Sequence, residues 1–229
     1  MRTLAWVLPG CVAATILVAS TMVALAQTTE PDAQRGAEIA AKGTSAGAPR
    51  CVACHSVAGS PDGSGTFPRL FGLPRFYLVK QLDDFKAKLR TNDIMAPVAQ
   101  LLSPQDIANV AAFYAAAIEP LPPFAASEPG LVAVGQKLAV EGSADKSVPA
   151  CNDCHGPGGI GEPPAIPSLA GQFAPYVAAQ LRDWRNGTRK NDGGQQMAGL
   201  AKRIDDRDIA AVAAYYQQVV TTSAAAASK

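Results

Sequence analysis

The sequence predicts an all-α protein made of two tandem domains that are related by duplication. Two observations support this prediction. Landmarks of the first half recur about 100 residues later, and amphipathic helical patterns occur in both copies with no convincing strand pattern between them. A proline-rich segment at 119–130, EPLPPFAASEPG, lies almost midway along the 229 residues and is typical of a linker.

The duplication is visible in pairs of segments that keep nearly the same spacing. The pairs are RGAEIAAKG at 35–43 with VGQKLAVEG at 134–142, FPRL at 67–70 with IPSL at 166–169, and YLVKQLDDF at 77–85 with YVAAQLRDW at 176–184. Each half is therefore expected to repeat one fold with three main helices. In the first half these helices cover about residues 32–42, 75–90 and 104–118.

Capping signals mark the start of the third helix in each copy. Ser103 precedes Pro104 and Asp106, which gives an N-cap, a first-turn proline and a capping acid. The second copy uses Asp205 as the N-cap and Asp208 as the capping acid. Apolar residues then recur at helical spacing, so each of these helices is expected to bury one face.

The first 26 residues are typical of an export signal. They carry one charge, Arg2, followed by a long apolar run that ends in Ala-Leu-Ala at 24–26, which predicts cleavage after Ala26. The run at 3–26 approaches the length of a membrane helix, so an uncleaved anchor in the inner membrane is the alternative. The expected parts of the chain are a signal peptide at 1–26, domains at 27–118 and 131–222 around a linker at 119–130, and a disordered tail at 223–229.

The charge of the exported chain argues against a nucleic-acid partner. Removing residues 1–26 leaves 203 residues with 19 basic and 19 acidic side chains, so there is no formal net charge. Proteins that bind nucleic acid are usually basic over the binding domain.

Each half contains a cysteine pair followed directly by a histidine, CVACH at 51–55 and CNDCH at 151–155. His55 and His155 are the only histidines of the chain. Two disulfides would not require a histidine after each pair, a zinc ribbon or finger would not separate the pairs by 97 residues, and a thioredoxin-like motif would need a βαβ context. The pattern predicts covalent attachment of two haem c groups.

The spacing suits the chemistry of haem attachment. Two thiols three residues apart can reach both vinyl groups of one porphyrin, and the next residue can offer its imidazole to the iron. Covalent attachment also retains haem in a domain of about 90 residues, which is too small to enclose it well. The expected tethers are Cys51, Cys54, Cys151 and Cys154, and the expected axial ligands are His55 and His155.

Methionine is the expected sixth ligand of each iron. Beyond the signal the chain has two methionines, Met95 and Met197, which follow their histidines by 40 and 42 residues. Each lies in a segment expected to be irregular, between the second and third helices, where a loop can carry the sulfur across the haem face. A methionine can also fill a gap in a core, but one per repeat at matching places favours ligation. A neutral thioether raises the reduction potential relative to two imidazoles.

Nearly the whole exported chain resembles the two-haem class I cytochromes of the cytochrome c4 type. The motifs that carry the resemblance are CVACH, FPRLFGLPRFYLVKQL, LRTNDIMAP and SPQDIANVAAFYA in the first half, and CNDCH, IPSLAGQFAPYVAAQL and DIAAVAAYY in the second. The resemblance implies two class I cytochrome c domains packed about a pseudo-twofold axis. It also implies a periplasmic location and electron transfer to a terminal oxidase.

The resemblance also assigns structural roles to two pairs of residues. Pro68 and Pro167 match the proline whose carbonyl accepts a hydrogen bond from the ligand histidine. Gly36 and Gly135 match the glycine at which the first and third helices cross closely, against Tyr114 and Tyr216. The second methionine is followed by Ala-Gly where the first is followed by Ala-Pro, so the two methionine loops are expected to differ.

The function predicted from the sequence is electron transfer and not enzymatic catalysis. The expected donor is a quinol-oxidising cytochrome complex or a dehydrogenase, and the expected acceptor is a terminal oxidase. A membrane-anchored subunit of a dehydrogenase or oxidase complex is the alternative. A dihaem peroxidase or sulfur-oxidising enzyme is disfavoured, because the exported chain has no spare histidine or cysteine near a haem. Basic residues cluster on the second helices and are expected on a solvated face or beside haem propionates, with a docking role as the alternative. They are Lys86, Lys88 and Arg90 in the first half and Arg182, Arg185, Arg189 and Lys190 in the second.

Overall fold

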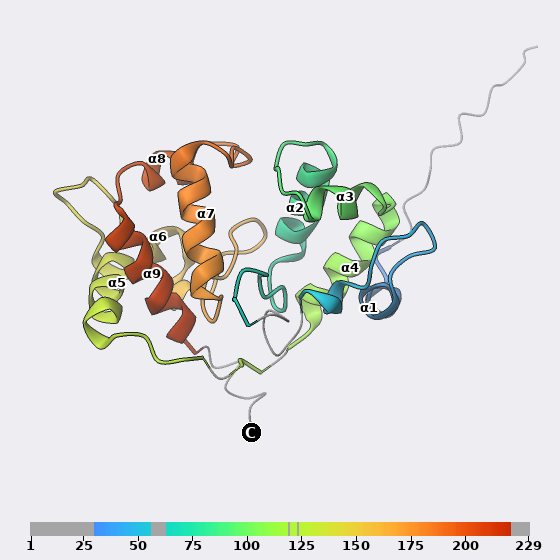
Figure 1. Ribbon diagram of the computed structural model, residues 1–229, viewed down its shortest axis with the longest axis horizontal. Coiled ribbons are helices and arrows are strands. Elements are labelled where there is room, and N and C mark those ends of the chain that lie inside the picture. Colours follow the sequence, from blue (N-terminus) through green and yellow to red (C-terminus); the bar gives the residue numbers. More distant parts are fainter. Residues whose placement is uncertain (1–29, 56–62, 119, 123, 221–229) are drawn as a thin grey trace, which may run out of the picture.

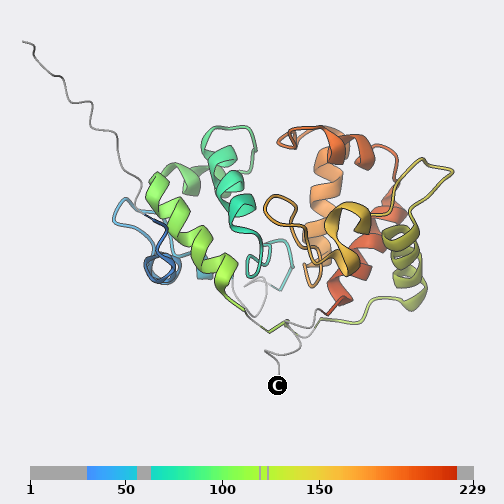
Figure 2. The same cartoon turned by 180° about the vertical axis from the view of Figure 1, so that it is seen from behind.

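The structure is a computed structural model that describes residues 30–55, 63–118, 120–122 and 124–220. The expected signal peptide at 1–26 and tail at 223–229 lie outside the described residues. Figure 1 shows two helical lobes side by side, one for each half of the chain, and Figure 2 shows the same arrangement from behind. Within the described residues the regular structure is helical, with two isolated antiparallel bridges, Ser143 with Val148 and Glu162 with Ile166. The all-α, two-domain prediction is confirmed.

The two lobes contain the same sequence of helices. The first lobe consists of α1 (Ala33–Lys42), η1 (Cys51–Ala53), α2 (Arg75–Lys86), α3 (Met95–Gln100) and α4 (Pro104–Ala116). The second lobe consists of α5 (Pro129–Glu141), α6 (Asn152–His155), η2 (Pro157–Gly159), α7 (Ala174–Asn186), α8 (Gln196–Ala201) and α9 (Asp206–Gln218).

The first and last helices of each lobe cross at a glycine. A Cβ added to Gly36 would lie 2.0 Å from the carbonyl oxygen of Asn109, and one added to Gly135 would lie 2.0 Å from that of Ala211. The close crossing is therefore as expected, but the partners are not. Gly36 meets the Asn109 and Phe113 side of α4, whereas the expected Tyr114 faces the core one position further around the helix.

The caps of α4 and α9 form as the sequence predicts. Ser103 Oγ accepts from the backbone of Asp106, and the Asp106 carboxylate accepts from the backbone N–H of Ser103. Asp205 and Asp208 make the same reciprocal pair. Each box fixes the start of a helix whose inner face carries a fully buried isoleucine at the matching position, Ile107 or Ile209.

Three features differ from the sequence-based expectations. Helix α2 ends at Lys86 instead of about residue 90, because Lys88 has a positive φ of 61° and the N–H groups of Leu89 and Arg90 both turn back to the carbonyl of Asp84. Each methionine lies in an additional short helix, α3 or α8. Helix α5 begins at Pro129, so the last residues of the expected linker are helical.

The lobes meet along α2 and α7, which face one another at the centre of the molecule (Figure 1). Polar side chains join them, as described below. None of the helices in the described part of the chain combines the length and the apolar character needed to cross a bilayer.

Candidate functional site

In the first CxxCH segment, both the backbone and the ring of the histidine are fixed by hydrogen bonds. It forms the short turn η1, and the backbone N–H of His55 donates to the carbonyl of Cys51 over 2.8 Å. The ring Nδ1 of His55 lies 2.9 Å from the carbonyl oxygen of Pro68. A carbonyl can only accept, so Nδ1 donates and the second nitrogen is left with its lone pair.

The second CxxCH segment repeats this geometry in α6. The backbone N–H of His155 donates to the carbonyl of Cys151 over 2.9 Å, and its Nδ1 lies 2.9 Å from the carbonyl oxygen of Pro167. The two histidines are buried to the same degree, with exposed fractions of 7% and 8%. The proline contacts implied by the family resemblance are therefore present in both halves.

The histidines are suited to bind a metal as neutral imidazoles. Burial lowers the pKa of both rings, which opposes protonation at neutral pH. The Nε2 atom of His55 is buried and has no hydrogen-bond partner in the described part of the chain. Because buried polar atoms are normally satisfied, an orphaned imidazole nitrogen of fixed tautomer fits an axial ligand of haem iron.

The cysteines fit covalent attachment better than the alternatives. The four cysteines of the described residues are not disulfide-bonded. Burial raises the pKa of the Cys51 thiol and raises that of Cys151 to about 11, so thiolate formation is opposed at both positions. A zinc site requires thiolates, whereas a haem thioether is neutral and suits a partly buried, apolar setting.

The two methionines occupy the starts of their short helices, and a side chain from the preceding segment holds each one. Asn92 Oδ1 accepts from the N–H of Met95 over 2.8 Å, and Asp192 Oδ2 accepts from the N–H of Met197 over 2.7 Å. Both methionine side chains are half-buried. The cap is a neutral amide in the first half and a carboxylate in the second.

The two halves differ in whether the methionine and the first cysteine of the motif pack against the same core cluster. Met197 and Cys151 pack against the same core cluster, which includes Leu138, Val177 and Tyr216. Cys51 packs against the corresponding cluster of the first lobe, but within the described residues Met95 is not among the side chains that contact that cluster.

A further difference between the sites was not predicted from the sequence. The hydroxyl of Tyr216 donates to Asn152 Oδ1 over 2.9 Å, which fixes the second CxxCH turn to α9. Val52 occupies the matching position in the first half and has no side-chain acceptor, so Tyr114 cannot make the corresponding bond to residue 52. Comparing the residue after the first cysteine in each motif could have indicated this asymmetry.

One curated relative and one solved structure show the family to which the chain belongs. Cytochrome c4 of Pseudomonas aeruginosa is 40% identical over 165 residues, which cover 71% of this chain and 80% of the relative. The crystal structure of reduced recombinant cytochrome c4 from Pseudomonas stutzeri matches with a TM-score of 0.71 and 33% identity, covering 83% of this chain and 100% of that chain. The chain belongs to the cytochrome c4 family. It is a dihaem c-type electron carrier with two covalently bound haem c groups.

Two further similar proteins have names that refer to thiosulfate dehydrogenase. The thiosulfate dehydrogenase electron acceptor of Stutzerimonas stutzeri is 42% identical over 173 residues, which cover 75% of this chain and 79% of that protein. The thiosulfate dehydrogenase TsdBA from Marichromatium purpuratum matches with a TM-score of 0.74 and 36% identity over 82% of this chain, which spans 40% of the TsdBA chain. The family described as cytochrome c oxidase, cbb3-type, subunit III matches residues 144–215.

Proposed function

We propose that this protein carries single electrons between two haems with His/Met ligation, in the periplasm, and passes them towards a terminal oxidase. The observation that carries the proposal is the duplicated histidine geometry. His55 and His155 each donate Nδ1–H to a proline carbonyl over 2.9 Å, which orients two equivalent rings in the same tautomer. Two equivalent buried ligands in one chain suit a two-centre carrier.

The proposed roles follow from the chemistry of each side chain. Each haem supplies a one-electron iron couple. Cys51 and Cys54 tether the first group, His55 offers its Nε2, and Met95 offers its sulfur from the start of α3. The corresponding set in the second half is Cys151, Cys154, His155 and Met197. The domain boundaries at 27–118 and 131–222 remain predictions.

The expected electron path can be tested by stopped-flow reduction and oxidation of the purified protein. The proposed donor is a quinol-oxidising cytochrome complex or a dehydrogenase, and the proposed acceptor is a terminal oxidase. Catalytic amounts of this protein are expected to restore electron flow between membranes that contain the donor and membranes that contain the oxidase. Failure to transfer electrons to any terminal oxidase, with both haems reducible, would contradict this part of the proposal.

A thiosulfate dehydrogenase is a second candidate donor. The observation that favours it is the 42% identity to an electron acceptor of that enzyme. The discriminating experiment mixes the oxidised protein with thiosulfate dehydrogenase and thiosulfate, and with a quinol-oxidising complex and quinol, under identical conditions. The donor that reduces the protein at a rate compatible with turnover is the functional one. The protein alone is expected not to oxidise thiosulfate, because we assign it no catalytic role.

We also propose a periplasmic location, with export directed by residues 1–26 and cleavage after Ala26. Attachment to the inner membrane through residues 3–26 is the alternative. Cell fractionation with N-terminal sequencing separates the two, since cleavage gives a periplasmic chain that begins at Gln27. Recovery of an uncleaved chain with the membranes would favour the anchored form.

A further inference from the structure

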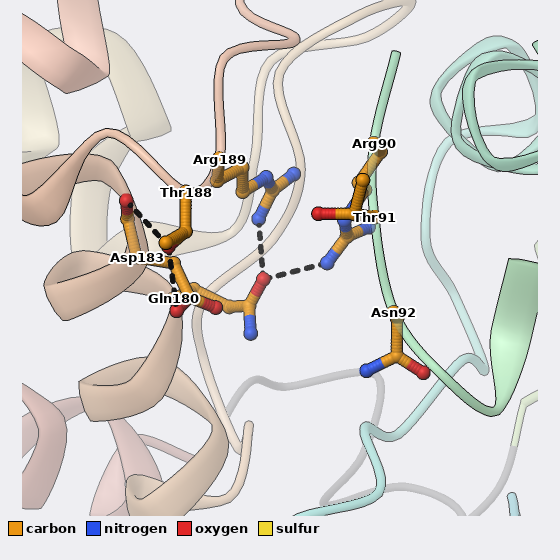
Figure 3. A pocket seen from close by; sticks show the side chains of 7 residues that line it. All are labelled: Arg90, Thr91, Asn92, Gln180, Asp183, Thr188 and Arg189. Carbon is orange, nitrogen blue, oxygen red and sulfur yellow. Dashed lines mark hydrogen bonds between the residues drawn. The ribbon is translucent and has the colours of Figure 1, made fainter. Parts of the chain in front are cut away.

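The interface between the lobes is polar and includes two buried arginines that are related by the duplication. Arg90 is 8% exposed and Arg189 is 5% exposed. Both guanidiniums donate to Oε1 of Gln180 in the second lobe, over 2.6 and 2.8 Å, and Figure 3 shows them approaching it from different lobes. The sequence-based expectation of a solvated face is therefore wrong for these two residues.

A second set of contacts at this interface holds the segment that leads to Met197. Lys80 of α2 donates from Nζ to the carbonyl oxygen of Asn191 over 2.7 Å, and the side-chain amide of Asn191 donates to Asp84 Oδ2 over 2.6 Å. Lys80 and Asp84 also form an ion pair one helical turn apart, and Asp84 is buried. The first lobe therefore fixes both the backbone and the side chain of Asn191 in the second.

Asn191 is followed directly by Asp192, which caps the second methionine segment. Asp192 Oδ2 accepts from the N–H of Met197 over 2.7 Å and from that of Ala198 over 3.2 Å. These bonds position the start of α8, from which Met197 offers its sulfur in the proposed function. A continuous series of contacts thus runs from α2 of the first lobe to the proposed methionine ligand of the second haem.

The first methionine segment is capped from within its own lobe. Asn92 precedes Asn191 by 99 residues and occupies the matching position in the duplication. Its Oδ1 accepts from the N–H groups of Ile94 and Met95. Within the described residues, no hydrogen bond joins the segment 91–95 to the second lobe. The position of Met95 is therefore not set by contacts of this kind across the interface.

The difference between the lobes arises at two positions of the second helices. Helix α7 carries Ala179 where α2 carries Lys80, so it has no amine at this position to reach across the interface. Asp183 matches Asp84, but it accepts from Thr188 of its own lobe over 3.1 Å, as Figure 3 shows. In the part of the chain that the structure describes, the contacts to a methionine segment thus cross the interface in one direction only.

We propose that Lys80 and Asp84 are positioning residues for Met197, so that docking of the first lobe strengthens the sulfur–iron bond of the second haem. This inference rests on the proposed His/Met ligation. A methionine whose helix start is already fixed loses less conformational freedom when its sulfur binds, and an added ligand then displaces it less readily. The first haem receives no such support, so only the second bond is expected to depend on the contacts of Lys80 and Asp84.

The test measures how readily imidazole displaces each methionine in the oxidised holoprotein. NMR follows the displacement, because the signals of a bound methionine disappear when imidazole replaces it, and Met197→Ala identifies the signals of the second haem. In Asp84→Ala, the affinity of the second haem for imidazole is expected to rise about two- to tenfold, the factor that corresponds to the loss of one typical hydrogen bond. The first haem, although it belongs to the mutated lobe, is expected to keep its wild-type affinity. Equal changes at both haems, a change at the first alone, or a change at neither would overturn the proposal.

Matched variants separate positioning from general loss of stability. Lys80→Met keeps the aliphatic part of a partly exposed side chain and is expected to act in the same direction as Asp84→Ala. If Asp84→Ala does not fold, an unchanged second haem in Lys80→Met contradicts the proposal. Asp84→Asn keeps an acceptor oxygen for Asn191 and is expected to restore most of the wild-type behaviour.

Asp83→Ala is the control for charge, because it removes an exposed carboxylate from the adjacent position of α2. It is expected to leave the imidazole affinities of both haems unchanged. An effect at the second haem as large as that of Asp84→Ala would show that the contact with Asn191 is not what acts.

A double-mutant cycle tests whether Lys80 acts through the cap of Met197. Asp192→Ala alone is expected to raise the imidazole affinity of the second haem, and adding Lys80→Met is expected to have little further effect. Full additivity of the two changes would mean that Lys80 acts by another route, which contradicts the proposal. Failure of the proposed ligation is recognised separately, because the wild type would then lack the signals of a second bound methionine.

Discussion

At the scale of single residues, the two haem sites have the same hydrogen bonds around the histidine and different ones around the methionine. The histidine contacts are the same within 0.1 Å in the two halves, because each depends on one proline carbonyl. The methionine sides rest on different caps, Asn92 in the first half and Asp192 in the second. Axial-ligand strength is therefore expected to respond to these caps one haem at a time.

Replacing Asn92 by alanine is expected to weaken the hold on Met95. The substitution removes the acceptor for the N–H groups of Ile94 and Met95. Loss of such an acceptor at the start of a helix lowers the stability of that helix by about 1 kcal/mol. The affinity of the first haem for added imidazole, which must displace the methionine, is expected to rise about fivefold. An equilibrium titration followed by absorbance measures this affinity, and the second haem serves as the internal reference.

Asn92→Asp is the control for this prediction, because it keeps an oxygen acceptor at the same place. It is expected to bind imidazole nearly as weakly as the wild type. Equal imidazole affinities in the wild type and in Asn92→Ala would show that the cap does not position Met95.

At the scale of elements, the glycine crossings determine how closely the helices of each lobe pack. Gly36→Ala would place a methyl group 2.0 Å from the carbonyl oxygen of Asn109, in a backbone that cannot move aside alone. Helices α1 and α4 must separate, and the free energy of unfolding is expected to fall by about 1–3 kcal/mol or more. Chemical denaturation followed by circular dichroism measures the change.

Gly199→Ala provides the matched control in another helix. Gly199 lies inside α8 and an added Cβ would meet nothing within 4 Å. Alanine there is expected to leave stability unchanged or to raise it by up to about 1 kcal/mol, through helix propensity. If Gly36→Ala and Gly199→Ala lowered the free energy of unfolding by similar amounts, the close helix crossing would not be the reason for the effect at Gly36.

The elements also show what the sequence could and could not predict. The capping box of α4 and the close crossing of α1 and α4 were predictable from the sequence, because each depends on a local pattern. Ser103 indicates the box and Gly36 indicates the crossing. The turn after α2 depends on a positive φ at Lys88, for which lysine gives no signal. The sequence pattern therefore predicts a helix that continues to about residue 90, with Arg90 on its face. Burial of Arg90 follows from contact with the other lobe, and that contact is not encoded in the period of either helix.

At the scale of the whole molecule, the Gln172 side chain of the second lobe bonds to the first lobe beside the proline that orients His55. Gln172 is 6% exposed, accepts from the N–H of Arg69 over 2.8 Å and donates to the Arg69 carbonyl over 2.9 Å. Arg69 directly follows Pro68, whose carbonyl orients His55. Docking of the lobes is thus coupled to the placement of one proposed iron ligand.

Gln172→Leu is expected to loosen this coupling. It removes both hydrogen bonds to a backbone that is partly buried, at a cost of about 1–3 kcal/mol. We expect calorimetry to show a broader or split unfolding transition and small-angle scattering to show a larger radius of gyration. Gln172→Glu keeps the acceptor for the Arg69 N–H. Its unfolding transition and radius of gyration are expected to lie between those of the wild type and Gln172→Leu. A sharp transition at the wild-type temperature in Gln172→Leu would contradict the coupling.

The most direct test of the proposed two-centre carrier counts methionine-ligated irons in the oxidised protein. The family resemblance implies a far-red absorption band for methionine sulfur bound to ferric haem iron, and we expect its intensity to correspond to two irons per chain. Met95→Ala and Met197→Ala should each lose half of the band. A band that corresponds to one iron in the wild type, or a high-spin signal in fresh protein, would contradict His/Met ligation at both haems.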